Sequence, residues 1–159
     1  MAALTLRFLI VTLLLLFSDA KAYPFTGEVV RVVNGDVIEI LHNGKSQPVR
    51  LYGIDCPAEG QPYGSSAKEV ISIMSYALNV TLQIHGKDRY GRILADVVLA
   101  DGTNLNHVLV KEGWCWWDRP HAPESAILEA LEAEARDASR GLWIDPSPVS
   151  PWAWRKLAK

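Results

Sequence analysis

The chain has 159 residues, which is room for one ordinary domain and not for two. Its formal net charge is −2, so it lacks the basic surplus of most nucleic-acid binders, and a polyanion would need a local basic cleft or a metal ion. With two cysteines and four histidines that show no ligand spacing, a zinc site is not expected.

The first 22 residues predict a secretory signal peptide. Arg7 precedes an apolar run over residues 8–17, and Ala20-Lys21-Ala22 resembles a cleavage site. Ten apolar residues are too few to span a bilayer. We expect cleavage after Ala22 and a secreted or periplasmic protein without stable membrane insertion, an uncleaved anchor being the alternative. Removing this segment leaves 14 Lys and Arg against 17 Asp and Glu.

Residues 23–146 form the predicted domain, and residues 147–159 a tail that contains proline and tryptophan. β-Branched runs and turn residues predict strands over residues 26–33, 37–41, 48–54, 80–85 and 93–99. Apolar residues at helical spacing predict helices over residues 65–78, 104–112 and 123–139. Ser65 or Ser66 is the expected cap of the first helix and Thr103 that of the second. We expect the proline-rich stretch over residues 145–151 to be extended.

This order of elements predicts a mainly β fold with helices, of the α+β class. Three strands, a helix and two further strands would make a five-stranded antiparallel unit. The order fits an OB-type Greek-key barrel accompanied by three helices. On pattern alone, an open α+β sheet is the competing interpretation.

Four charged residues lie on a predicted strand or in turns between strands. Arg50 and Asp55 belong to the third strand and its end, Asp36 follows a turn, and Arg92 follows the turn before the last strand. Carboxylates suit a hard divalent cation, and guanidinium groups suit phosphate oxygens. Taken singly, each could instead be a turn cap or a solvated side chain.

Three ordered segments carry a family resemblance: VVNGD ending at Asp36, VRLYGIDCP ending at Pro57, and DRYGRILA beginning at Asp88. Together with RGLW before Ile144, they make the chain resemble the staphylococcal nuclease (thermonuclease-like) family from about Phe25 to about Trp154. The resemblance implies an OB barrel that hydrolyses DNA, RNA or both with the help of Ca²⁺.

The resemblance also implies roles for particular residues. Asp36, Asp55 and the backbone carbonyl of Cys56 correspond to calcium ligands. Arg50 and Arg92 correspond to the catalytic arginines that hold the phosphate, and Tyr90 corresponds to a residue lining the substrate pocket. Nucleic acid is therefore the expected substrate, and the protein is expected to be a monomer.

The chain departs from the family pattern beside these residues. Ala58 stands where the family has a glutamate that acts as general base, and Glu59, one step later, is a possible substitute. Asn34 and Val37 replace an aspartate and a threonine. Two hypotheses follow: an exported, calcium-dependent endonuclease of low sequence specificity, or a catalytically weakened OB module that binds nucleic acid or a protein.

Cysteine and tryptophan leave two further questions open. Cys56 and Cys115 permit one disulfide in an exported protein, but the sequence does not show whether they meet. Trp116 and its neighbours could stack on bases or pack in the core. The remaining tryptophans are expected to anchor the tail by packing; they are Trp143, Trp152 and Trp154.

Overall fold

The computed structural model describes residues 25–157. The predicted signal peptide lies outside these residues. Within them, no helix combines the length and apolar character that crossing a membrane requires.

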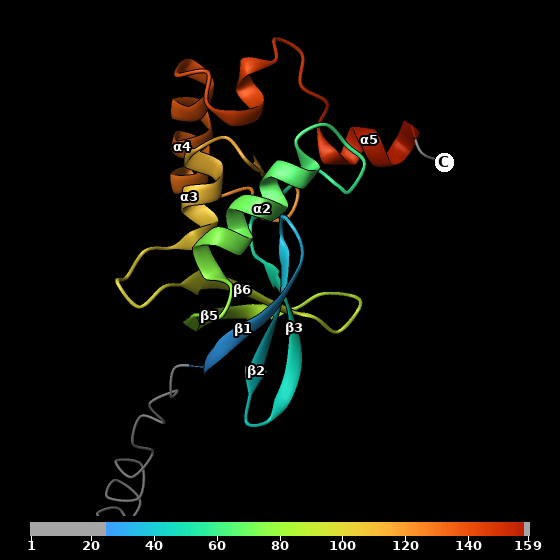
Figure 1. Ribbon diagram of the computed structural model, residues 1–159. Coiled ribbons are helices and arrows are strands. Elements are labelled where there is room, and N and C mark those ends of the chain that lie inside the picture. Colours follow the sequence, from blue (N-terminus) through green and yellow to red (C-terminus); the bar gives the residue numbers. More distant parts are fainter. Residues whose placement is uncertain (1–24, 158–159) are drawn as a thin grey trace, which may run out of the picture.

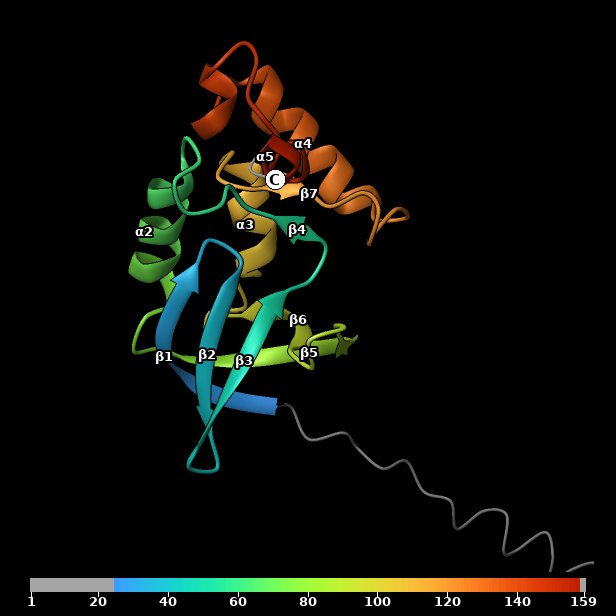
Figure 2. The ribbon, with the colours of Figure 1, turned by 90° about the vertical axis from the view of Figure 1, so that its right-hand side faces the viewer.

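Five strands close into a barrel (Figures 1 and 2). They are β1 (Phe25–Asn34), β2 (Val37–His42), β3 (Lys45–Leu51), β5 (Asn79–Lys87) and β6 (Ile93–Val98). Their order around the barrel is β1-β2-β3-β6-β5, as expected for the OB-type fold. The expected all-antiparallel pairing is wrong, because β3 and β6 run parallel. An odd number of strands around a closed ring cannot alternate in direction throughout, so at least one neighbouring pair must be parallel.

The predicted third strand is interrupted. β3 ends at Leu51, Gly53 adopts a positive φ of 74°, and the chain then forms β4 (Ile54–Asp55). β4 leaves the barrel and pairs with β7 (Trp116–Trp117) in a separate two-stranded sheet. Val49 and Leu51 point into the core, while Arg50 points away from it. The interruption carries Asp55 to the mouth of the barrel.

Helices cover one end of the barrel (Figure 1). They are α2 (Gly64–Ser75), α3 (Leu105–Lys111), α4 (Ala126–Asp137), the 3-10 helix η1 (Gly141–Ile144) and α5 (Pro151–Leu157). The expected serine cap of α2 is wrong, since Tyr63 precedes the helix and makes no side-chain cap. Asn104, not Thr103, caps α3 by accepting a hydrogen bond from the His107 N–H. Residues 145–150 form neither helix nor strand. The tail then forms α5, a helix that was not predicted; it begins at Pro151, where proline suits a first helical turn.

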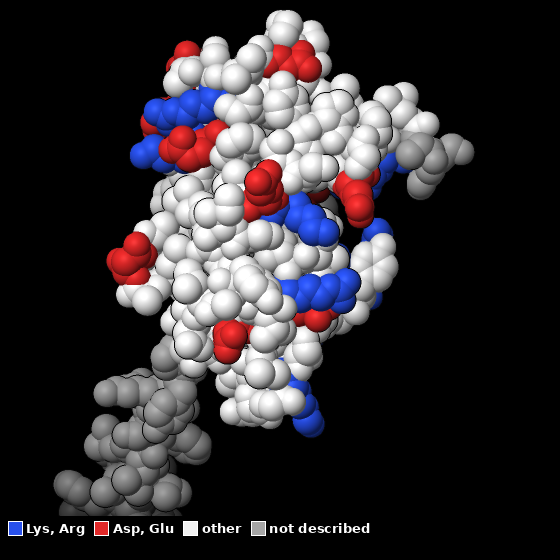
Figure 3. All heavy atoms as spheres, viewed as in Figure 1, with Lys and Arg blue, Asp and Glu red and all other residues white. Residues whose placement is uncertain are grey.

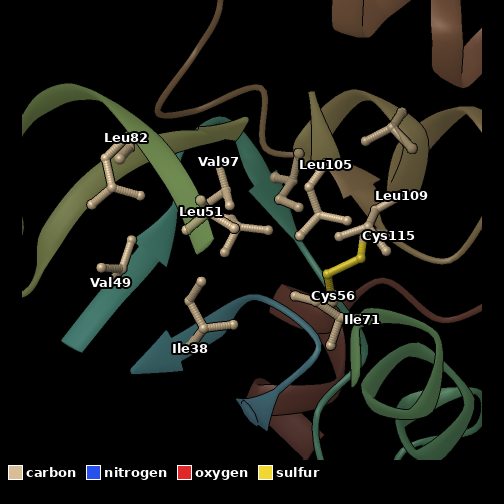
Figure 4. Close-up of a cluster of buried hydrophobic side chains, with 14 of the residues drawn as sticks. Ile38, Val49, Leu51, Cys56, Ile71, Leu82, Val97, Leu105, Leu109 and Cys115 are labelled. Atoms are coloured by element: carbon tan, nitrogen blue, oxygen red, sulfur yellow. A yellow bond between two sulfur atoms is a disulfide. The ribbon is translucent and has the colours of Figure 1, made fainter. Parts of the chain in front are cut away.

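The core lies where the barrel meets the helices (Figure 4). Ile38, Leu51 and Val97 from the strands lie beside Leu105 and Leu109 of α3. A disulfide joins Cys56 to Cys115 at this junction, which answers the question that the sequence left open. It ties the segment after β4 to the segment before β7.

A second apolar cluster holds the C-terminal part. Trp116 lies edge-on to Trp143 at 4.4 Å and to Trp152 at 5.5 Å between ring centroids, and the Arg136 guanidinium lies 3.8 Å from the Trp143 ring centre. Trp143 and Trp152 are thus packing anchors, as predicted. Because Trp116 and Trp117 are buried, neither presents a face on which a base could stack.

Candidate active site

A cleft of about 650 Å³ opens beside the mouth of the barrel. Four segments line it: residues 50–55, the β5–β6 connection, residues 118–121, and α5. Figure 3 shows Lys and Arg side chains gathered around a hollow on this side of the molecule, between the β5–β6 connection and α5. The acidic chain therefore possesses a local basic cleft, as a polyanionic substrate would require.

Arg50 brings the two predicted aspartates together. Its Nη1 lies 3.0 Å from Asp36 Oδ2, and its Nη2 lies 3.5 Å from Asp55 Oδ1. Both carboxylates are buried, with 3% of each residue exposed. Three of the four charged residues singled out in the sequence thus form one contact group at the cleft.

Local hydrogen bonds hold Asp36 in place. Asn34 Oδ1 accepts a hydrogen bond from the Asp36 N–H at 3.0 Å, which forms an Asx turn, and Asp36 Oδ2 accepts one from the Cys56 N–H at 3.2 Å. Burial raises the pKa of Asp36 from 3.8 to about 6, with Arg50 opposing the shift and Asp55 adding to it. Two buried carboxylates that repel each other favour a bound cation.

One such cation is an arginine outside the three sequence motifs. Arg155 of α5 grips Asp55 in bidentate fashion, with Nη1 3.1 Å from Oδ1 and Nη2 2.6 Å from Oδ2. The hydrogen bonds that Arg155 donates to Asp55 raise the pKa of its guanidinium. The two residues are 100 positions apart, and no local pattern in the tail pointed to this contact.

Arg92 and Tyr90 line the same cleft from the β5–β6 connection. Asp88 Oδ2 accepts a hydrogen bond from Arg92 Nε at 2.6 Å, while Oδ1 accepts from the backbone N–H groups of Tyr90 and Arg92. Slight burial acts to raise the pKa of Asp88, but these hydrogen bonds outweigh it and lower the pKa below its usual value. Asp88 thereby orients the Arg92 guanidinium, and Tyr90 lines the cleft with most of its ring exposed.

The possible substitute base is placed elsewhere. Glu59 is exposed in the turn between β4 and α2, and neither it nor Ala58 lines the cleft. Paired hydrogen bonds between Ala58 and Gln61, both of 3.0 Å, fix this turn, and Gln61 is tied to the Val149 carbonyl at 2.7 Å. The structure therefore does not bring Glu59 together with Arg50 and Asp55.

Asp118 and His121 line the cleft, although the sequence analysis assigned them no role. Asp118 is buried, and its carboxylate accepts a hydrogen bond from His121 Nδ1 at 2.8 Å. In the sequence, the spacing of three residues between this acid and this histidine was the only indication that the two side chains could pair.

The donor set agrees with a calcium ion in its chemistry. Two buried carboxylates and the Cys56 carbonyl are oxygen ligands of the type that Ca²⁺ takes, with waters completing the shell. Among residues 25–157, no group of three or more His, Cys, Asp or Glu side chains could by itself hold a metal. Because both oxygens of Asp55 contact Arg155, a cation at this position would have to displace that guanidinium or share the carboxylate with it.

A closed OB-type barrel with arginines and buried carboxylates at its mouth defines a class of phosphate-ester-binding proteins. A model of the family described as staphylococcal nuclease homologue matches residues 48–145, and the chain belongs to this family.

Several relatives cover most of the chain. It is 40% identical over 129 residues to an "Uncharacterized endonuclease" of Escherichia coli, which covers 81% of this chain and 84% of that protein. It is 35% identical to a "Micrococcal nuclease" of Shigella flexneri, over 99% of this chain and 96% of that protein. A third relative, "Protein ParB" of Escherichia coli, is 36% identical over 82% of this chain and 78% of its own length.

Proposed function

We propose that this nuclease-family protein is an exported, calcium-dependent endonuclease that hydrolyses DNA, RNA or both with low sequence specificity. The observation that carries the proposal is the contact of Arg50 with both buried aspartates at the mouth of a basic cleft. The names of two relatives, an endonuclease and a micrococcal nuclease, support it.

The residues divide the work between metal and phosphate. Asp36, Asp55 and the Cys56 carbonyl would hold Ca²⁺, which when bound polarises a phosphoryl oxygen and orients the attacking water. Arg50 and Arg92 bind the phosphate and stabilise the charge that develops on its oxygens. Tyr90 contacts the nucleotide from the β5–β6 connection.

Low sequence specificity agrees with the chemistry of the cleft. Its arginines suit phosphate oxygens, which are the same at every nucleotide, and the buried Trp116 and Trp117 are withheld from the bases. The signal-like segment at residues 1–22 and the disulfide support export, because disulfides persist in oxidising compartments. The exported protein is proposed to act as a monomer.

The test is cleavage of supercoiled plasmid, single-stranded DNA and RNA by the purified exported protein, with Ca²⁺ and with chelator. We expect chelator-sensitive cleavage that Arg50→Gln reduces by at least about 10²-fold, as for loss of one preorganised charge contact. Arg31→Gln is the matched control, because Arg31 is exposed on the barrel and pairs with Glu39. Equal loss in both variants, or cleavage indifferent to chelator, would overturn the proposal.

A weakened binding module is the second candidate, and the absence of both Ala58 and Glu59 from the cleft lining favours it. It predicts that the protein binds oligonucleotides without cleaving them. Ala58→Glu, which restores a carboxylate at the family's position, should then produce cleavage. If the unaltered protein cleaves nucleic acid with many turnovers, this second function is excluded.

A further inference from the structure

The cleft that the arginines line also contains an imidazole–carboxylate pair, Asp118 and His121. The geometry points to His121 as the general base of phosphodiester hydrolysis, with Asp118 as its positioning residue. This inference rests on the proposed nuclease function and names the group that removes the proton from the attacking water. The pair lies between β7 and α4, and both residues line the same cleft as Arg50 and Asp55.

Asp118 determines which nitrogen of His121 is available. Its two carboxylate oxygens lie 3.0 and 2.8 Å from His121 Nδ1. An ionised carboxylate only accepts hydrogen bonds, so in the neutral ring Nδ1 carries the proton and Nε2 keeps a free lone pair. The same arrangement of acid and imidazole orients the base in other hydrolases.

Burial and backbone contacts make Asp118 a rigid support. The Asp118 side chain is 10% exposed, whereas that of His121 is 77% exposed. The Asp118 N–H donates to the Gly53 carbonyl at 2.9 Å, and the Asp118 carbonyl accepts from the N–H groups of His121 and Ala122. The carboxylate is therefore fixed to the corner between β3 and β4, while the ring it orients is open to water and substrate.

The charged and titratable groups around the ring come from each wall of the cleft. From its own segment they are Asp118 and Arg119, from residues 50–55 they are Arg50, Tyr52 and Asp55, and from α5 there is Arg155. From the β5–β6 connection they are Lys87, Asp88, Arg89, Tyr90 and Arg92. The Tyr52 hydroxyl donates to the His121 carbonyl at 3.4 Å, so this wall also restrains the loop. A phosphate held by the arginines would lie in the cleft that His121 lines.

The reaction balances without a further reactant. The oxygen of water forms a bond to phosphorus, the ester P–O bond breaks, and the proton of the water passes to His121 Nε2. The leaving oxygen takes up a proton from solvent, and the imidazolium returns its own proton to solvent, which restores the base. The positive charge that forms on the ring is stabilised by Asp118.

The pair also accounts for the missing glutamate. A general base must reach its proton directly or through one water, and neither Ala58 nor Glu59 lines the cleft. His121 is a titratable side chain that lines it with a free ring nitrogen. The alternative is an exposed ion pair within a local turn, which would contribute little to stability and nothing to the rate.

The test compares His121→Gln and Asp118→Asn with the control His42→Gln. His42 lies at the far end of β2, where its Nδ1 contacts the Thr26 carbonyl. We expect His121→Gln to lower kcat by about 10²-fold, with KM little changed. The acid limb of the kcat/KM–pH profile should be lost in this variant, because the limb reports protonation of the base. Added imidazole should restore activity to His121→Gly, and Asp118→Asn should lower kcat while displacing the same limb.

Two outcomes separate this inference from the function on which it rests. If the unaltered protein cleaves nucleic acid but both variants keep its rate and pH profile, the base assignment is overturned and the nuclease stands. If the unaltered protein does not cleave at all, the proposed function itself fails. ¹⁵N NMR of the free protein gives a check without activity: the ring should carry its proton on Nδ1, and a proton on Nε2 would overturn the assignment.

Discussion

The disulfide allows a prediction whose size follows from the chain. Cys56 and Cys115 are 59 residues apart, so the bond restricts a long loop of the unfolded chain. In the chain-entropy model, closing a loop of this length stabilises the folded state by about 4 kcal/mol at 25 °C. For a domain of this size, that corresponds to a fall in Tm of about 15 °C on reduction.

The assay is thermal unfolding of the protein with and without reductant, followed by circular dichroism. The double variant Cys56→Ala, Cys115→Ala is the matched control: it should unfold near the temperature of the reduced protein and be indifferent to reductant. Both positions are buried beside the core, so the smaller side chains add a packing loss to the entropic one. A reduced protein whose Tm differs from that of the oxidised one by less than about 3 °C would refute the entropic reasoning.

Three further predictions concern buried charges. Arg155→Met keeps much of the apolar stem but removes the guanidinium that contacts Asp55. The affinity for Ca²⁺, measured by calorimetry, should therefore rise about tenfold. Unchanged or weaker affinity would mean that Arg155 does not compete with the cation. Folded Asp36, with its pKa of about 6, holds its proton more tightly than an unfolded aspartate does. In the presence of chelator, the free energy of unfolding should therefore fall as the pH rises from about 4 to about 6, by at most about 3 kcal/mol. Urea titrations of Asp36→Asn should lack this fall, and equal slopes in both proteins would contradict the prediction. Glu132→Ala removes the acceptor of the buried backbone N–H of Trp117 and should lower the free energy of unfolding by about 1–3 kcal/mol in chemical denaturation. Glu132→Gln keeps an acceptor and should cost less; equal losses would argue against the hydrogen bond as the cause.

The barrel was predictable because its signals are local. β-Branched runs bounded by turn residues predicted five strands, and each lies in or overlaps a strand of the barrel. The parallel pairing of β3 with β6 was missed, since strand direction around a closed ring depends on the number of strands and not on any one of them. The helix at Pro151 was missed for a related reason, because a short segment rich in proline is stabilised mainly by what it packs against.

The candidate site was predictable in part. Asp36, Arg50 and Asp55 lie in ordered motifs next to predicted strands, so their meeting at one place follows from a barrel that closes. Arg155 joins them from the far end of the chain, and the Asp118–His121 pair reaches the cleft from the loop after β7. The tail gave no local signal for Arg155, and the only signal for Asp118 and His121 was their spacing of three residues.

By itself, the sequence determined the fold class, the family and three of the charges that converge, because periodicity and motif order are properties of neighbouring residues. Only the tertiary structure decided that Cys56 bonds to Cys115, that Arg155 forms an ion pair with Asp55, and that Glu59 lies outside the cleft. These contacts depend on how distant segments lie in space. Neither the turn that fixes Ala58 nor the packing that anchors α5 can be predicted from the pattern of neighbouring residues.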